Sequence, residues 1–270
     1  MKKIIALVMA VCCVLALAAC GKPAETVSTT EATEQSTQAP ETQPVVTAPA
    51  GNGDDAKSEG VMTYAEYMAV GLDESVVIEA FVQAKQSWWD DKATVYAQDA
   101  DGGYFIYNMS CSEEDFARLV PGTKIKVSGY KTEWSGEIEI AEGATFEIEN
   151  DSSFIAPSTD VTALLGTDEL YEHQNKFVAF NGLKVEACND NGDVYMYSWD
   201  GSGSDGDDLY FSASLNGKIY TFTVESYLCD KTTEVYSAVK NLKIGDVIDM
   251  EGFLYWYESA NPHITNVTVK

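Results

Sequence analysis

Aromatic side chains in polar segments are the residues of this sequence whose types and spacing best suit a binding task. All five tryptophans lie in such segments, which run between stretches that alternate apolar and polar residues. Flat rings in exposed loops stack on sugars or bases, or dock the apolar side chains of a partner. The candidate ligand-binding residues are therefore Trp88, Trp89, Trp134, Tyr195, Tyr197, Trp199, Tyr255 and Trp256.

The sequence contains no comparably clear pattern of catalytic or metal-binding residues. His173 and His263 are the only histidines and each is isolated, so local spacing builds neither a zinc cluster nor a histidine-based triad. The segment from Asp200 begins like a calcium loop, but Asp205 occupies the position of the turn glycine and Phe211 the position of the last glutamate. We predict no catalytic residue, no metal site and no cofactor, and therefore a protein that is not an enzyme.

The charge balance narrows the class of partner. The chain has 43 acidic and 17 basic residues, a net charge of −26, and Arg118 is its single arginine. Nucleic acids and anionic lipids are held by Lys and Arg, so a surface this acidic repels them on average. The charge therefore favours a glycan or an extracellular protein as the ligand, with nucleic acid an unlikely partner and a monomer as the expected state.

The first twenty residues have the features of a secretory signal. Lys2 and Lys3 precede an apolar run that is too short to span a bilayer, and the run ends in small residues before Cys20. The Leu17-Ala-Ala-Cys20 sequence resembles the lipobox of bacterial lipoproteins. That resemblance implies that residues 1–19 are a signal peptide and that Cys20 carries lipid, palmitate included. The membrane would then be a partner through this anchor, with the protein on the extracellular face of the bacterial cell membrane.

Residues 20–60 and the rest of the chain differ sharply in composition. The first of these segments is rich in Thr, Glu, Pro and Gln and has almost no large apolar side chain, so it predicts a disordered tether. The remaining residues are enough for two domains of about 100 residues each. We place their bounds at 61–152 and 156–270.

A repeated segment links these two domains. The twelve residues from Leu119 to Tyr130 and those from Leu242 to Phe253 both place a glycine at the fourth and eleventh positions and apolar residues at the seventh and ninth. Each copy follows a short helical pattern and continues as a strand with period two. One small fold is therefore expected twice.

The order of the elements indicates which fold this is. In the first copy, three strands, a short helix from Ser112 and two more strands follow one another, with a hairpin at Asp101-Gly102-Gly103. The second copy has Asn216-Gly217 at the matching hairpin and a longer acidic loop before it. This order resembles the OB-fold, a five-stranded Greek-key barrel. The predicted class is all-β with short helices, as two tandem OB-fold-like barrels.

Two alternatives to a glycan-binding or protein-binding module stay open on the sequence alone. The rings could pack the barrels together or join another envelope component, and the run from Tyr255 to Tyr257 suits packing between domains best. The OB-fold resemblance also implies single-stranded nucleic-acid binding, which the charge disfavours. Cys188 and Cys229 either pair or remain buried free thiols.

Overall fold

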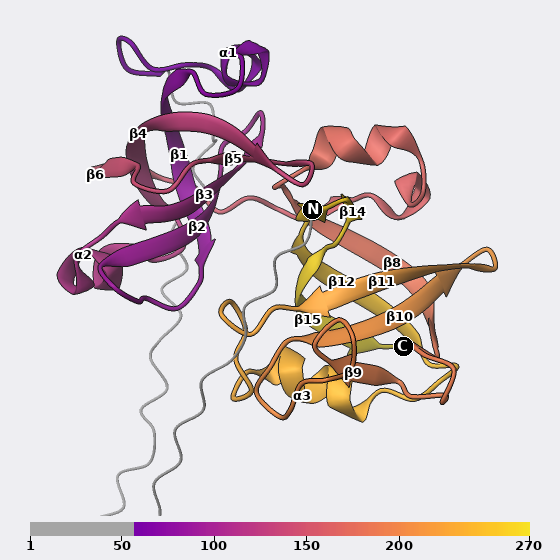
Figure 1. Cartoon of the computed structure of the whole chain (residues 1–270). Coiled ribbons are helices and arrows are strands. Elements are labelled where there is room, and N and C mark those ends of the chain that lie inside the picture. The colour runs from indigo at the N-terminus through magenta and orange to yellow at the C-terminus, as the bar shows by residue number, and fades with distance from the viewer. Residues whose placement is uncertain (1–56) are drawn as a thin grey trace, which may run out of the picture. The chain divides into compact units, whose positions relative to one another are not determined.

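The computed structural model describes residues 57–270, and Figure 1 shows their strands forming two barrels. Cys20, the signal peptide and most of the predicted tether lie outside the described residues, so lipidation and an extracellular location stay predictions. In the part of the chain that the structure describes, no helix is long and apolar enough to cross a membrane. Lys57, near the end of the predicted tether, forms a 2.7 Å salt bridge with the buried carboxylate of Asp99.

The first barrel closes through five strands with one short helix between the third and the fourth. Strand β1 pairs with both β2 and β4, while β3 pairs in parallel with β5 and β5 pairs with β4. This is the strand order of an OB-fold. An additional strand, β6, extends the sheet beyond β4. The elements are α1 (Tyr64–Ala69), β1 (Ser75–Lys85), β2 (Lys92–Gln98), β3 (Gly103–Ser110), α2 (Glu113–Arg118), β4 (Thr123–Trp134), β5 (Glu137–Ile140) and β6 (Thr145–Ser153).

The second barrel repeats the same closure. Strand β8 pairs with β10 and β12, while β11 pairs in parallel with β15 and β15 pairs with β12. The long acidic loop before β10 contains the short strand β9, which pairs with β10. The elements are β7 (Thr159–Asp160), η1 (Thr162–Leu164), η2 (Asp168–His173), β8 (Phe177–Glu186), β9 (Tyr195–Tyr197), β10 (Leu209–Leu215), β11 (Lys218–Val224), α3 (Glu234–Asn241), β12 (Val247–Phe253), β13 (Trp256–Tyr257), β14 (Ser259–Ala260) and β15 (His263–Val269).

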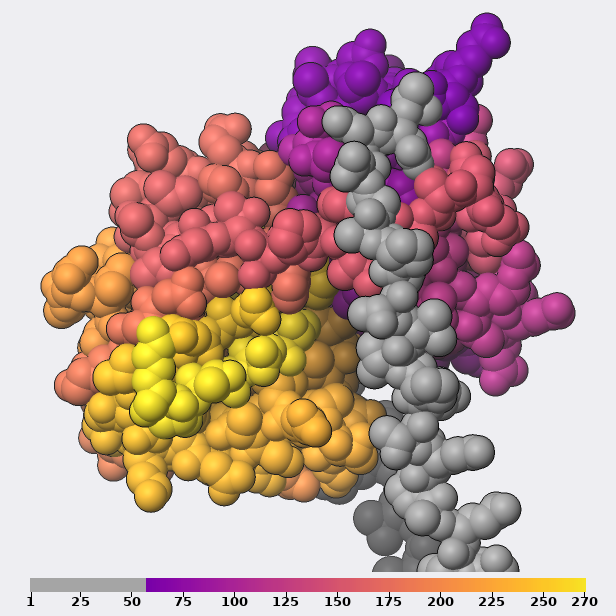
Figure 2. Space-filling model, turned by 180° about the vertical axis from the view of Figure 1, so that it is seen from behind, coloured from indigo at the N-terminus to yellow at the C-terminus, as the bar shows by residue number. Residues whose placement is uncertain are grey.

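The predicted class, two tandem OB-fold barrels, is therefore correct. Each barrel has its own apolar core, and the repeated segment forms equivalent strands, β4 and β12. Ile125 and Ile248 are both fully buried, and Gly122 and Gly245 both have positive φ, at 89° and 96°. Figure 2 shows the C-terminal residues, in yellow, at the surface of the second barrel between its salmon and orange segments. The proposed domain bounds of 61–152 and 156–270, as units that fold independently, stay a prediction.

The second glycine of the repeat allows β12 to approach β15 closely. A Cβ on Gly252 would lie 2.2 Å from the carbonyl oxygen of His263, which is backbone and has no room to move. We therefore expect Gly252→Ala to lower the free energy of unfolding by about 1–3 kcal/mol, the usual cost of overpacking. Urea denaturation measures this change. Gly71→Ala is the matched control, because its Cβ would meet its nearest atom at 3.7 Å, and equal losses in both variants would contradict the account.

The three cysteines within residues 57–270 are free. Cys111 and Cys229 are buried and Cys188 is partly exposed, and no disulfide joins Cys188 to Cys229. Burial raises the pKa of the Cys229 thiol to about 12, so this thiol stays protonated at neutral pH. The buried thiols act as small apolar side chains.

Candidate functional site: an aromatic groove between the barrels

A cavity with aromatic walls lies where the two barrels face each other. Its volume is about 960 Å³, within the range of small-molecule binding sites. In an OB-fold, ligands cross the second and third strands between the loop that joins strands one and two and the loop that joins strands four and five. Residues from this region of both barrels line the cavity, which we call the interbarrel groove.

The wall from the first barrel is built on the outward side of β3. Tyr104 and Ile106 point into the barrel core, so the alternating residues Phe105 and Tyr107 face outward, with their rings 6.5 Å apart and stacked. Trp134, the last residue of β4, completes this wall with 59% of its surface exposed. An apolar outward row on a strand is not needed for the barrel core and therefore indicates a contact surface.

The wall from the second barrel is contributed by the corresponding region. Trp199 lies in the long loop before β10 and is 76% exposed, the highest exposure among the large apolar side chains named for the described chain. Tyr210 lies on β10, and Tyr257 on β13 is 48% exposed. Exposed rings on both walls leave their faces free to stack on a flat ligand.

Buried aromatic contacts hold the walls in place. Tyr96 stacks on Phe253 at 4.4 Å, and its hydroxyl is hydrogen-bonded to Nδ1 of His263 at 2.8 Å. Burial lowers the pKa of His263 to about 3, so this imidazole is neutral at physiological pH. Tyr255 stacks on His263 at 4.4 Å and contacts Phe105 edge-on at 5.3 Å. The packing alternative is therefore correct for Tyr255, which joins the barrels as well as lining the groove.

Backbone and amide hydrogen bonds also cross between the barrels. Ser87 donates its backbone N–H to the carbonyl of Tyr227 at 2.7 Å, and the Nδ2 of Asn175 donates to the carbonyl of Ile138 at 2.9 Å. The backbone N–H of Trp256 donates to Oε2 of Glu137, a fully buried carboxyl. Burial raises the pKa of Glu137 well above its usual range, because loss of water disfavours the charged form.

Carboxyl groups supply the charge of the groove. Glu139, on β5, and Glu225, after β11, are 7% and 8% exposed. Burial raises the pKa of each to about 7, and the nearby carboxylate of Asp208 contributes to the shift at Glu225. Glu225 also accepts a hydrogen bond from Nε2 of Gln86 at 3.2 Å, across the barrel contact. Asp208 and Glu258 complete the charged lining, which contains no Lys or Arg.

The groove brings together three of the eight predicted residues, Trp134, Trp199 and Tyr255. The other five lie elsewhere. Trp88 donates its indole N–H to the carbonyl of Cys111 at 2.9 Å, and Trp89 is 51% exposed with the ammonium of Lys92 lying 4.7 Å from its ring. Tyr195 and Tyr197 pack against the core of the second barrel, 5.5 Å apart, and Trp256 lines a second pocket.

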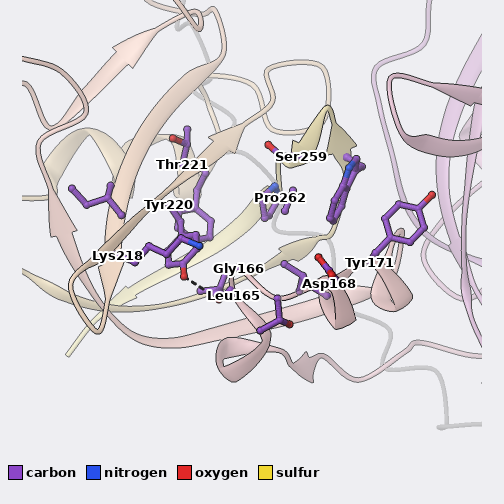
Figure 3. Close-up of a pocket in the computed structure, with 15 residues that line it drawn as sticks. Leu165, Gly166, Asp168, Tyr171, Lys218, Tyr220, Thr221, Ser259 and Pro262 are labelled. Carbon is purple, nitrogen blue, oxygen red and sulfur yellow. Dashed lines mark hydrogen bonds between the residues drawn. The ribbon is translucent and has the colours of Figure 1, made fainter.

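That second pocket lies on the second barrel and has a volume of about 660 Å³. Figure 3 shows Lys218, Tyr220 and Thr221 on one side of it and Asp168 and Tyr171 on the other. The hydroxyl of Tyr220 donates to the carbonyl of Leu165 at 2.9 Å, drawn as a dashed line. Trp256 meets Tyr171 edge-on at 5.1 Å.

Reasoning from the sequence missed Phe105, Tyr107, Tyr210, Glu139 and Glu225. The strand from Tyr104 carries aromatic residues at consecutive positions, Tyr104-Phe105 and, two residues later, Tyr107. A strand with rings on both faces signals a second contact surface, because one face fills the core and the other does not. Glu139 and Glu225 had no such signal, since the burial of a carboxyl depends on tertiary contacts that the sequence pattern does not show.

Metal ligation finds no support in the geometry of the described chain. Within residues 57–270, no three His, Cys, Asp or Glu side chains cluster as a metal site. In the acidic loop, Asp205 instead forms salt bridges with Lys231 at 3.5 Å and Lys240 at 2.5 Å.

Comparisons with known proteins give structural likeness only. No family model matches the chain, and no curated protein matches it. Among solved structures, a murine DNA-binding protein bound with double-stranded DNA has 10% identity and a TM-score of 0.35, over 72% of this chain and 96% of that chain. The p202 HIN1 domain in complex with a 12-mer double-stranded DNA has 12% identity and a TM-score of 0.34, over 82% and 99%. A replication protein A heterotrimer bound to single-stranded DNA has 11% identity and a TM-score of 0.31, over 73% and 49%.

These descriptions correct the predicted ligand. The sequence favoured a glycan or an extracellular protein, with the membrane as a further partner and nucleic acid unlikely, whereas the proteins just named are described with DNA. The physical reason for the error is that the prediction used the average charge of the chain, while the groove has aromatic walls and two carboxyls whose pKa lies near 7. The OB-fold assignment itself rests on the strand pairing within the two barrels.

Proposed function

We propose that this chain is a non-enzymatic nucleic-acid-binding module that holds an unpaired strand by its bases in the interbarrel groove. The observation that carries the proposal is that the ligand-binding regions of both OB barrels line one cavity with exposed rings, among them Trp134, Trp199 and Tyr257. Every base has a flat face, and base stacking on an aromatic ring is worth about 1–3 kcal/mol. Several rings in one groove therefore suffice for binding that does not depend on sequence.

The groove must bind bases rather than phosphates, because no Lys or Arg lines it and its one histidine, His263, is neutral. The backbone of the strand would then point toward solvent, away from Asp208 and Glu258. Glu139 and Glu225 are about half protonated at neutral pH, which reduces their repulsion of phosphate. A protonated carboxyl both donates and accepts a hydrogen bond, so it can pair with a base edge.

Salt gives a distinctive test of this binding mode. Proteins that neutralise phosphates lose affinity steeply as salt rises, because released counterions drive their binding. In this acidic chain salt screens repulsion instead, so we expect the affinity for a 20-mer single strand to stay constant or to rise between about 20 and 200 mM NaCl. Fluorescence anisotropy with a labelled mixed-sequence oligonucleotide measures this. A matched duplex should bind more weakly, because its bases are already stacked.

Two results would contradict the proposal. One is the absence of binding to the single strand at any salt concentration in this range. The other is a steep loss of affinity with salt, which would place the contact on phosphates and therefore outside the groove.

A second candidate ligand is an organic cation, such as a quaternary ammonium or a polyamine. One observation favours it: the charged lining of the groove consists of carboxyls beside exposed rings. Rings attract cations through their negative faces, by about 0.5–2 kcal/mol each. The pH dependence separates the two candidates, because ionised carboxylates attract a cation and repel a strand.

A further inference from the structure

The second pocket adjoins the interbarrel groove. Both cavities are lined by Thr221, Ser259 and Ala260, so they meet at β14 and the neighbouring part of β11. Trp256 and Tyr257, consecutive residues of β13, line the pocket and the groove respectively. A molecule that occupies the groove can therefore reach the pocket without leaving the surface of the second barrel.

The pocket is shaped for a flat apolar group. Leu165, Leu170, Phe222 and Pro262 line it, and the perpendicular rings of Tyr171 and Trp256 form one end. The hydroxyl of Tyr220 is engaged by the carbonyl of Leu165. The polar groups that remain for a ligand are chiefly those of Lys218 and Asp168.

Lys218 is the single lysine or arginine in the lining of either cavity. Among residues 57–270, its ammonium has no carboxylate within salt-bridge distance, whereas Asp205 in the same barrel has two lysine partners. The ammonium lies 5.3 Å from the centre of the Tyr220 ring. A cation without a partner, at the edge of an apolar pocket in a chain of net charge −26, fits an anionic group of a ligand.

Gly166 makes room for this lysine. Its φ is +79°, and a Cβ there would lie 2.4 Å from Nζ of Lys218 and 2.9 Å from the Tyr220 hydroxyl. The absence of a side chain at this position lets the ammonium lie over the wall of the pocket. The connector between η1 and η2 thus shapes the pocket around the lysine.

We infer that this pocket is a subsite for one nucleotide, with the base against the apolar wall and the phosphate on Lys218. This inference rests on the proposed function and extends it from the groove to the adjoining pocket. Asp168, on the side opposite Lys218, accepts a hydrogen bond from the amino group of a base such as adenine (Figure 3). The subsite therefore gives the strand a phosphate contact that the groove lacks.

Isothermal titration of the full chain with dAMP and with deoxyadenosine tests the subsite. We expect dAMP to bind about 10-fold more tightly, since a charge-assisted contact contributes about 1.5 kcal/mol. Lys218→Gln should remove the difference and leave deoxyadenosine binding unchanged. Lys243→Gln, which changes a lysine of the same barrel that lines neither cavity, is the control and should keep the difference.

The outcomes separate this inference from the proposed function. Three results would overturn the subsite. They are equal affinity of the wild-type chain for dAMP and deoxyadenosine, no binding of dAMP, and a tighter binding of dAMP than of deoxyadenosine that persists in Lys218→Gln. The groove proposal would still stand if the 20-mer binds. Conversely, dAMP binding that depends on Lys218, with no binding of the 20-mer, would support the pocket and reject the groove as a strand-binding site.

Discussion

Replacing both Trp134 and Trp199 by alanine is expected to weaken binding of a 20-mer single strand by at least about 30-fold. Each ring lies on a different wall of the groove and is largely exposed, so each can stack on a base. Two stacking contacts at about 1 kcal/mol or more each give this loss. Fluorescence anisotropy with the wild-type and variant chains measures it.

Trp89→Ala is the control for this experiment. Trp89 is 51% exposed, close to the 59% of Trp134, but it lies outside the groove. Its removal should leave the affinity within about 2-fold of wild type, since surface changes away from a site have small effects. Thermal melting should show little change in any of the variants, because the removed rings are exposed. If the folded double variant binds the single strand as tightly as wild type, Trp134 and Trp199 do not contribute to the binding site.

Single-strand affinity is expected to fall about 10-fold as the pH rises from 6 to 8. Burial raises the pKa of Glu139 and Glu225 to about 7, so both carboxyls are largely neutral at pH 6 and largely ionised at pH 8. The two added charges repel the phosphates of the strand by about 1 kcal/mol or somewhat less each, across a groove of intermediate dielectric. Anisotropy titrations at the two pH values measure this change.

The double substitution Glu139→Gln and Glu225→Gln should make the affinity independent of pH between 6 and 8 and hold it at the pH 6 level. An organic cation should show the opposite trend in the wild-type chain, with tighter binding at pH 8. A wild-type affinity for the strand that rises with pH would therefore contradict the proposed function and favour the cation.

The raised pKa values of Glu139 and Glu225 also make the free energy of unfolding depend on pH. Both carboxyls bind their protons more tightly in the folded chain than at the ordinary value of 4.5. The stability that this contributes is fully present below about pH 4.5 and is lost as the pH rises through about 7. Urea denaturation at pH 6 and 8 should therefore show a less stable chain at pH 8, and binding is compared where both samples are folded.

The sequence predicted the barrels well because local signals specify them. Asn216-Gly217 forms the expected hairpin, with both residues at positive φ, and the apolar residues of the repeated segment fill equivalent core positions. Strand periodicity and turn chemistry depend on neighbours within a few residues, so they can be read without coordinates. The same reasoning identified Trp134 and Trp199, because a tryptophan in a polar segment has no core to enter.

The candidate site was predicted only in part because it depends on a contact between distant segments. Trp88 and Trp256 have the same sequence character as Trp134, yet one bonds to Cys111 and the other turns into the second pocket. Phe105 and Tyr107 lie in an ordinary strand pattern, which does not distinguish them from core residues. Which rings share a cavity is decided by the orientation of one barrel against the other, and no local pattern encodes that.

By itself, the sequence determined that an acidic chain would fold into the same small barrel twice, because periodic apolar residues and turn glycines act locally. The tertiary structure alone decided that the barrel faces lining the interbarrel groove meet, and that Glu139 and Glu225 line this groove with a pKa near 7. The physical reason is that a carboxyl changes its proton affinity when it loses water, and the loss of water depends on tertiary packing that no local pattern encodes.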